Sequence, residues 1–315
     1  MFPRAALSIL FALVLCACKE RPLHFPVERT RARLERGRYL VNAVAICFQC
    51  HSEIDWNGAV PGLPVQGGLG AGRSEMMPFL VAIPNLTPDR ETGAGMWSDE
   101  QLYRAMTEGI GHDGRTLFPE MPYTQFRKLS YEDLGSIIVY LRSIPAVRKA
   151  LPKSKVPPDV QARYRPISTK VEQTPPDLST PEKRGAYLAA AAGCADCHTP
   201  PQGLGKMPGL DYAGGFLFQG PWGTVSSANL TPDPSGIPYY DERMFLEVMR
   251  TGVNGGRKLA PIMPWMYFRD MTAGDLRSVF AYLRTLKPVL HRTDNTEPPS
   301  PCRKCGNRHG FGAMN

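Results

Sequence analysis

Long apolar runs are almost absent from this chain of 315 residues. The longest extends from Ala5 to Ala17 and is interrupted by Ser8. It is too short to cross a lipid bilayer, which takes about 20 apolar residues. A short apolar run that follows a basic residue, here Arg4, is instead typical of the central region of a signal peptide. We therefore expect residues 1–17 to form a signal sequence that directs export.

The run ends in a pattern that resembles the bacterial lipobox, Leu15-Cys16-Ala17-Cys18. Cleavage after the small residue Ala17 would place a lipid on Cys18, whereas bulky Leu15 makes Cys16 a poorer candidate. The alternative is an ordinary cleaved signal with an incidental cysteine. The first interpretation predicts a lipoprotein anchored to a membrane on the periplasmic side of a bacterium. The second predicts a soluble periplasmic protein.

Scattered cysteines are also missing. The eight cysteines fall into four close pairs, which is not the arrangement of a dispersed disulfide framework. The pairs are Cys16 and Cys18, Cys47 and Cys50, Cys194 and Cys197, and Cys302 and Cys305.

A strong excess of one charge is lacking as well. The chain has 37 basic and 29 acidic residues, which gives a formal net charge of +8. Because this charge is modest and no nucleic-acid-binding motif accompanies it, we expect no nucleic-acid partner. Basic residues do gather between Arg29 and Arg38. That run either contacts anionic headgroups or an acidic partner, or forms a solvated helix face.

What the chain does contain, twice, is a Cys-x-x-Cys-His motif. This is the attachment signature of a c-type haem. Cysteines three positions apart on a helical turn present both sulfur atoms to one face of the porphyrin, and the next histidine ligates the iron. A Cys-x-x-Cys pair alone also occurs in zinc ribbons and thiol redox sites. Two complete motifs predict two covalently bound haem c groups, held by Cys47, Cys50, His51, Cys194, Cys197 and His198.

The two motifs begin two similar blocks of sequence. Arg36-Gly37-Arg38-Tyr39-Leu40, before the first motif, corresponds to Arg184-Gly185-Ala186-Tyr187-Leu188 before the second. Further on, Asn85-Leu86-Thr87-Pro88-Asp89 corresponds to Asn229-Leu230-Thr231-Pro232-Asp233. Internal repetition of this kind predicts two tandem domains. We expect domains at 30–147 and 181–290, a Pro-rich linker or strap at 148–180, and a flexible tail at 291–315.

An amphipathic helix is expected to close each block and to cross the helix that precedes the haem motif. Ser130 with Asp133, and Thr272 with Asp275, form near capping boxes. Apolar residues follow at the i, i+3, i+4, i+7 spacing of one helix face. The sequence therefore predicts a mainly α-helical protein of two cytochrome c-like domains with long loops rich in proline and glycine. The predicted apolar faces are Leu134, Ile137, Ile138 and Leu141, and Leu276, Val279, Phe280 and Leu283.

Each iron also needs a distal ligand. Met121 and Met263 occupy the same position in the two blocks, next to prolines that stiffen an extended loop. A thioether on such a loop suits this role, and His/Met ligation raises the reduction potential of a haem. We predict His51 and Met121 as the ligands of the first iron, and His198 and Met263 as those of the second.

Other methionines and histidines compete for these roles. Met266 is the nearest rival to Met263, and His112 lies shortly before Met121. If His112 replaced Met121, the first haem would have two histidine ligands and a lower potential. The remaining histidines lie outside the repeated blocks and look incidental: His24, His291 and His309.

The last cysteine pair, Cys302 and Cys305, is followed by Gly306 rather than histidine. It therefore lacks a proximal ligand and is not expected to hold a third haem. A local disulfide is one alternative in an oxidising compartment. A metal site that includes His309 is another, although it would have only three ligands.

Together these motifs resemble the multihaem cytochrome c subunits of bacterial membrane-bound dehydrogenases, such as those for alcohols, gluconate or sorbitol. The resemblance covers most of residues 30–290. It implies that electrons pass from a quinoprotein or flavoprotein partner toward ubiquinone or an oxidase. Those subunits typically carry three haem domains, whereas this sequence has two motifs. The resemblance rests on the haem motifs and on Asn85–Asp89, Gly95–Ser98, Gly114–Leu117, Met121–Tyr123, Tyr140–Arg142 and Tyr282–Arg284.

The sequence thus predicts an electron carrier whose partners are a dehydrogenase subunit and an oxidase or quinone-linked complex. Because protein ligands fill both positions of each predicted iron, no substrate site remains on the metal. The alternative is a dihaem enzyme, such as a peroxidase or a thiosulfate-oxidising cytochrome, which needs an open distal position. A redox sensor is a third class, for which no feature of the sequence speaks directly.

Overall fold

The structure is a computed structural model, which describes residues 27–76, 78–167 and 175–311. Helices account for 33% of the described residues and strands for 12%, so the prediction of a mainly α-helical protein is confirmed. The predicted signal sequence and Cys18 lie outside the described residues. Within the described ranges, we find no helix with the length and apolar character needed to cross a membrane.

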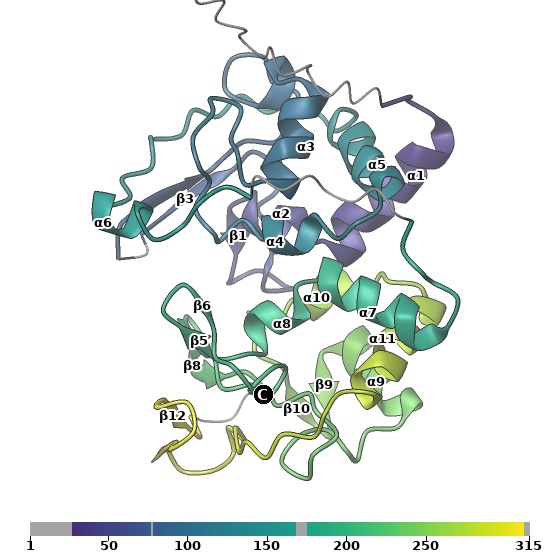
Figure 1. The fold of residues 1–315 in the computed structure, drawn as a ribbon, viewed down its shortest axis with the longest axis vertical. Coiled ribbons are helices and arrows are strands. Elements are labelled where there is room, and N and C mark those ends of the chain that lie inside the picture. Colours follow the sequence, from purple (N-terminus) through teal and green to yellow (C-terminus); the bar gives the residue numbers. More distant parts are fainter. Residues whose placement is uncertain (1–26, 77, 168–174, 312–315) are drawn as a thin grey trace, which may run out of the picture.

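A similar order of helices and strand pairs occurs twice along the chain (Figure 1). The first half contains α1 (Arg31–Tyr39), the π-helix η1 (Leu40–Val44), α2 (Cys47–Cys50), β1 (Ile54–Asp55), β2 (Leu63–Pro64), β3 (Arg73–Met76), β4 (Leu80–Ile83), the 3-10 helix η2 (Ala94–Met96), α3 (Asp99–Thr107), α4 (Tyr123–Phe126) and α5 (Tyr131–Leu141). The second half contains α7 (Pro181–Ala191), α8 (Cys194–Cys197), β5 (Pro201–Gln202), β6 (Gly205–Lys206), β7 (Leu217–Gly220), β8 (Gly223–Ser226), α9 (Glu242–Thr251), β9 (Val253–Asn254), β10 (Arg257–Lys258), α10 (Trp265–Phe268) and α11 (Ala273–Arg284).

The first and last helices of each half pack directly on each other: α1 on α5, and α7 on α11. Gly37 and Gly185 make this close approach possible. A Cβ at Gly37 would lie 1.9 Å from the carbonyl oxygen of Ser136, and one at Gly185 would lie 1.8 Å from that of Ser278. The glycine shared by the two sequence blocks is therefore a contact point between helices. The predicted crossing of these helices is confirmed.

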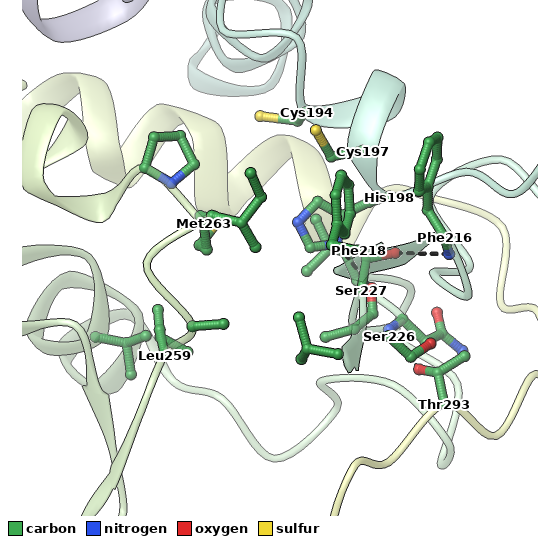
Figure 2. Close-up of a pocket in the computed structure, with 18 of the residues that line it drawn as sticks. Cys194, Cys197, His198, Phe216, Phe218, Ser226, Ser227, Leu259, Met263 and Thr293 are labelled. Carbon is green, nitrogen blue, oxygen red and sulfur yellow. Dashed lines mark hydrogen bonds between the residues drawn. The ribbon is translucent and has the colours of Figure 1, made fainter. Parts of the chain in front are cut away.

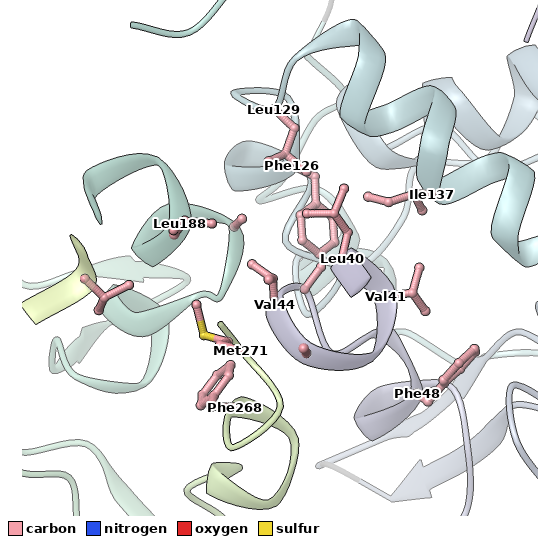
Figure 3. Close-up of a cluster of buried hydrophobic side chains, with 14 of the residues drawn as sticks. Leu40, Val41, Val44, Phe48, Phe126, Leu129, Ile137, Leu188, Phe268 and Met271 are labelled. Carbon is pink, nitrogen blue, oxygen red and sulfur yellow. The ribbon is translucent and has the colours of Figure 1, made fainter. Parts of the chain in front are cut away.

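The hydrophobic core runs without a break from one half into the other (Figure 3). η1 of the first half contacts α10 of the second, and α4 of the first half contacts α7 of the second. A short helix of each half therefore packs against the other half. The predicted apolar faces of α5 and α11 are buried in this cluster. Burial of each such aliphatic side chain contributes about 1.5–3 kcal/mol. Representative members are Leu40, Val44, Phe126 and Ile137 from the first half, and Leu188, Phe268 and Met271 from the second.

Polar contacts reinforce the junction in a symmetrical pattern. The Tyr39 hydroxyl donates to Asp275 across 2.5 Å, and that of Tyr187 donates to Asp133 across 2.7 Å. Each carboxylate also binds an arginine of its own half, at 2.8 Å for Arg36 and 2.6 Å for Arg184. The two halves thus form one continuous body with an approximate two-fold relation.

The segment that joins the halves lies along the first of them as a strap. Lys155 N donates to Leu80 O (2.8 Å), and Ile167 N donates to Glu108 O (2.9 Å). The short helix α6 (Pro158–Gln161) lies between these contacts. The sequence left a linker or a strap as alternatives, and the described part, 148–167, forms a strap.

The C-terminal segment differs from the expected flexible tail. Residues 285–311 fold back on the second half and end in the strand pair β11 (Ser300–Pro301) and β12 (Arg308–His309). Asn295 exchanges two hydrogen bonds of 2.9 Å with the backbone of Ser226 in β8. Because these paired amides are buried, the segment is held as part of the domain.

Candidate haem sites

Each Cys-x-x-Cys motif forms a four-residue helix, α2 or α8, that begins after a residue in the left-handed region. Ile46 has φ 41° before α2, and Gly193 has φ 67° before α8. Glycine adopts this conformation freely, but a β-branched residue such as isoleucine does so at a cost of about 1–3 kcal/mol. The sharp turn ahead of the motif occurs in both halves, although only Ile46 in the first half bears that cost.

The histidine after each pair is buried and held by one hydrogen bond. Nδ1 of His51 lies 2.8 Å from the carbonyl oxygen of Pro84, and Nδ1 of His198 lies 2.7 Å from that of Ala228. A carbonyl oxygen can only accept, so Nδ1 carries the proton and Nε2 keeps its lone pair. A second partner of this kind is what fixes the orientation of a metal-binding imidazole.

The residues that supply these carbonyls precede the repeated Asn-Leu-Thr-Pro-Asp segments. Asn85 Oδ1 accepts from the backbone nitrogen of Thr87 at 2.9 Å, and Asn85 Nδ2 donates to Val147 O at 2.8 Å. Asn229 makes the same contacts with Thr231 and Val289, each at 2.9 Å. Both asparagines are fully buried. The motif that carries the sequence resemblance therefore holds the loop that orients the histidine.

Burial keeps the two imidazoles neutral. It lowers the pKa of His51 to about 4, and it also lowers the pKa of His198. Both pKa values move in the direction that leaves Nε2 unprotonated at neutral pH. An iron ligand needs this form of histidine.

A large cavity lies beside the second motif (Figure 2). Its volume is about 1160 Å³, above the roughly 300–1,000 Å³ of ordinary small-molecule pockets. Figure 2 shows Cys194, Cys197 and His198 at one side of the cavity, with Met263 and Leu259 across from them. Much of the remaining wall is apolar, which suits a porphyrin. Further lining residues are Phe216, Phe218, Val248, Met249, Leu276 and Leu283.

The first motif reaches the same cavity. Cys50 and Gln49 of α2 line its wall, together with Arg73 and Glu120. The Nε atom of Arg73 is buried and finds no hydrogen-bond partner among the described residues. A buried, unpaired donor is costly, and a carboxylate such as a haem propionate would satisfy it. The donor set and the cavity therefore fit a haem, and the two motifs open toward each other.

Met121 and Met263 occupy equivalent loops. Tyr123 N donates to Met121 O at 2.8 Å, and Trp265 N donates to Met263 O at 2.7 Å. Both methionines are half-buried and pack against the core. Met263 lines the cavity, whereas its rival Met266 is almost fully buried and contacts Gly62 of the first half.

His112 lies on an exposed turn and stacks on Trp97. The ring centroids are 4.2 Å apart and the planes differ by 11°. Its backbone oxygen accepts from Gln101 Nε2 at 2.9 Å. This environment is that of a surface histidine, which leaves Met121 as the stronger candidate ligand of the first site.

Several groups that shape these sites were not predicted from the sequence. Pro84 and Ala228 act through their backbone carbonyls. Arg73 acts through contacts with residues that are distant in sequence. Repetition of Asn85 and Asn229 was visible in the sequence and is the one signal that pointed to this region. The predicted basic run is largely paired, because Arg31, Arg33 and Arg36 bind Glu35, Glu132 and Asp133.

Comparison with known proteins confirms the resemblance stated from the motifs. The chain is 31% identical over 81% of its length to a subunit of nicotinate dehydrogenase from Pseudomonas putida. It is 27% identical over 82% of its length to the cytochrome c subunit of alcohol dehydrogenase (quinone) from Gluconacetobacter polyoxogenes. It is 28% identical over 59% of its length to a diheme cytochrome c-type protein of Cereibacter sphaeroides. No protein-family model matches the chain.

The chain covers only part of these relatives. It spans 21% of the Pseudomonas protein, 57% of the Gluconacetobacter protein and 63% of the Cereibacter protein.

Proposed function

We propose that this chain is a dihaem c-type cytochrome that carries single electrons between a membrane-bound or periplasmic dehydrogenase and the respiratory chain. The equivalence of the two sites carries the proposal. In each, a cysteine pair on a short helix is followed by a neutral histidine whose Nδ1 is tied to a backbone carbonyl. In each, a methionine on a proline-flanked loop occupies the matching position.

When bound, haem c supplies reversible one-electron chemistry, and the protein controls its potential and exposure. Cys47 and Cys50 would hold one porphyrin, and Cys194 and Cys197 the other. His51 and His198 would each offer Nε2 to an iron because Nδ1 is committed to a carbonyl, and His198 lines the cavity. Met121 and Met263 would occupy the distal positions and raise the potential of each iron. Much of the cavity wall is apolar, and Arg73, which forms an ion pair with Glu75, keeps a buried Nε donor that a propionate could satisfy.

The position of the two motifs supports electron transfer within the chain. Cys50 of the first motif and Cys194 and Cys197 of the second line one cavity. The two proposed attachment sites therefore border one cavity, which residues of both halves line.

The relatives support a carrier over an enzyme. Their names are those of dehydrogenase subunits and of a dihaem cytochrome, which does not favour a peroxidase or a thiosulfate-oxidising cytochrome. We therefore infer a dehydrogenase as the electron donor and an oxidase or quinone-linked complex as the acceptor. We also propose that the mature protein lies on the periplasmic side of a bacterial membrane, anchored by lipid on Cys18, or else is soluble in the periplasm.

The haem content of the exported full-length chain tests the proposal. Wild-type protein should hold two haems in a pyridine haemochrome assay. The double variants C47A/C50A and C194A/C197A should each hold one. C302A/C305A is the matched control, because it removes a cysteine pair that no histidine follows, and it should keep two.

Kinetics of the dihaem protein separate the carrier from the enzyme. In stopped-flow mixing, a one-electron reductant should transfer one electron to each haem. An oxidant should then return both haems to the oxidised state. Steady-state turnover of hydrogen peroxide or thiosulfate by the purified protein would contradict the proposal.

A further inference from the structure

Four side chains with soft or nitrogen donor atoms meet at the C-terminal segment, away from the haem motifs. One donor atom from each of the four residues lies within 4.8 Å of the other three; the residues are His291, Cys302, Cys305 and His309. Cys302 Sγ is 3.3 Å from His291 Nε2, and Cys305 Sγ is 3.2 Å from His309 Nε2. The two thiols are not bonded to each other. The local disulfide considered from the sequence is therefore absent here, and His291 supplies a fourth donor that the sequence did not reveal.

These distances suit a tetrahedral metal ion. Zinc binds thiolate sulfur at about 2.3 Å and imidazole nitrogen at about 2.0–2.1 Å. A tetrahedron with those bond lengths separates sulfur from nitrogen by about 3.6 Å. The observed pairs are within a few tenths of an ångström of this value. The four donor atoms lie within 4.8 Å of one another, so side-chain shifts of about 1 Å would bring all of them to tetrahedral spacing.

Both histidines are oriented for ligation by a second hydrogen bond. His291 Nδ1 lies 2.9 Å from the carbonyl oxygen of Ala213, and His309 Nδ1 lies 3.0 Å from Ser226 Oγ. A proton on each Nδ1 satisfies these contacts and leaves the Nε2 lone pairs facing the thiols. The rings are 1% and 5% exposed, respectively.

The surrounding backbone is shaped around the two rings. A Cβ at Gly215 would lie 2.6 Å from Cε1 of His291 and 3.1 Å from Cε1 of His309, so only glycine leaves room for both. On the other side, Gly306 (φ 76°) reverses the chain after the cysteines. Gly306 N donates to Cys302 O at 3.0 Å, which brings the two sulfur atoms to the same side of the turn.

We propose that His291, Cys302, Cys305 and His309 form a structural zinc site. Four protein ligands of the Cys₂His₂ type leave no open position, which is typical of structural rather than catalytic zinc. Binding of Zn²⁺ releases one proton from each thiol, and the two thiolates neutralise the ion. The ion would close a loop within the C-terminal segment, and the two histidines would fix that loop on the second half through Ala213 O and Ser226 Oγ. Thr293 and Asn295, in the same segment, line the second haem cavity.

The test is metal analysis of the full-length dihaem protein, purified without chelators. We expect one zinc and two irons per chain. The zinc X-ray absorption edge, which is separate from that of iron, should show two sulfur neighbours at about 2.3 Å and two nitrogen neighbours at about 2.0–2.1 Å. Absence of zinc, or zinc in a shell of oxygen neighbours, would overturn the proposal.

Variants locate the site. C302S/C305S should lose the zinc, keep both haems and melt several degrees lower than wild type. R303A is the matched control within the same turn, because Arg303 is exposed, and it should keep one zinc. If C302S/C305S does not accumulate, H309Q answers the same question with a single substitution. Zinc retained at full stoichiometry in either cysteine or histidine variant would contradict the assignment, as would a Cys302–Cys305 disulfide detected by mass in wild-type protein.

The haem proposal and the zinc proposal fail independently. If the protein holds two haems and no zinc, the proposed electron carrier stands and the proposed zinc site is wrong. One zinc with no haem at either motif would do the reverse.

Discussion

Tyr39 and Asp275 are 236 positions apart in sequence, yet the tyrosine hydroxyl donates a hydrogen bond to that carboxylate. The same hydroxyl accepts from Thr272 N at 3.2 Å, at the first turn of α11. Tyr187 repeats both contacts in the opposite direction, with Asp133 and with Ser130 N at 3.0 Å. The repeated tyrosine of each half is therefore a cap for the closing helix of the other half.

Removal of either hydroxyl should weaken this junction. We expect Y39F and Y187F each to lower the free energy of unfolding by about 1–3 kcal/mol, because each leaves a buried carboxylate with one hydrogen bond fewer. Urea unfolding followed by far-UV circular dichroism measures the effect. Y239F is the control, since Tyr239 is 61% exposed and should change stability by less than about 0.5 kcal/mol. Equal stability of Y39F and wild type would show that the contact does not contribute.

The same contact predicts a dependence on alkaline pH. Burial, with the nearby Asp275 carboxylate, raises the pKa of Tyr39 from 10.0 to about 12. A group whose pKa is raised by folding stabilises the protein fully below its unfolded pKa and loses this effect as the pH rises through the folded value. The stability difference between wild type and Y39F should therefore be constant below pH 10.0 and shrink between 10.0 and about 12. Tyr187 is present in both proteins and cancels. A difference that stays unchanged up to pH 12 would contradict the assignment.

The shared glycine predicts a large packing effect. A Cβ at Gly37 would lie 1.9 Å from Ser136 O, which is a backbone atom and cannot turn away. We expect G37A to lower stability by about 3 kcal/mol or more, at the upper end of overpacking effects. G135A on the opposing helix is the control. The nearest atom to its Cβ is Val27 Cγ1 at 3.6 Å, so better helix propensity should make it neutral or stabilising by up to about 1 kcal/mol. Similar losses in both variants would argue against the close helix contact.

Substitutions of Met263 and Met266 distinguish a methionine that binds iron from one that only packs in the core. In M263L, the thioether that lines the cavity is lost, so the methionine-to-iron charge-transfer band of the oxidised protein should fall to about half, one of two sites. M266L replaces a buried side chain with one of similar volume and should keep the whole band, with a stability change below about 1.5 kcal/mol. Near-infrared absorption at equal haem content measures both. The reverse result would make Met266 the ligand.

Sequence reasoning was most successful where the argument was local or repeated. The capping residues Ser130 and Thr272 accept from the backbone nitrogens of Asp133 and Asp275, at 3.0 and 3.1 Å. The apolar faces that follow are buried as their spacing predicted. These features depend on neighbours within one or two helical turns, which the sequence displays directly.

Long-range contacts were beyond that reasoning. Asp133 and Asp275 looked like cap residues, but their carboxylates bind arginine and tyrosine from distant segments. His291 looked incidental because no spacing rule links it to Cys302, and the contact exists only because residues 285–311 fold back on β8. The carbonyls of Pro84 and Ala228 carry no side-chain signal at all. Positions of this kind depend on the path of the chain in space.

The most direct test of the central claim is a combined electron paramagnetic resonance and near-infrared spectrum of the fully oxidised, full-length protein. We predict two low-spin iron centres, each with a methionine-to-iron charge-transfer band, because His51 with Met121 and His198 with Met263 are the proposed ligand pairs. A high-spin centre, or a low-spin centre with two histidine ligands, would contradict it.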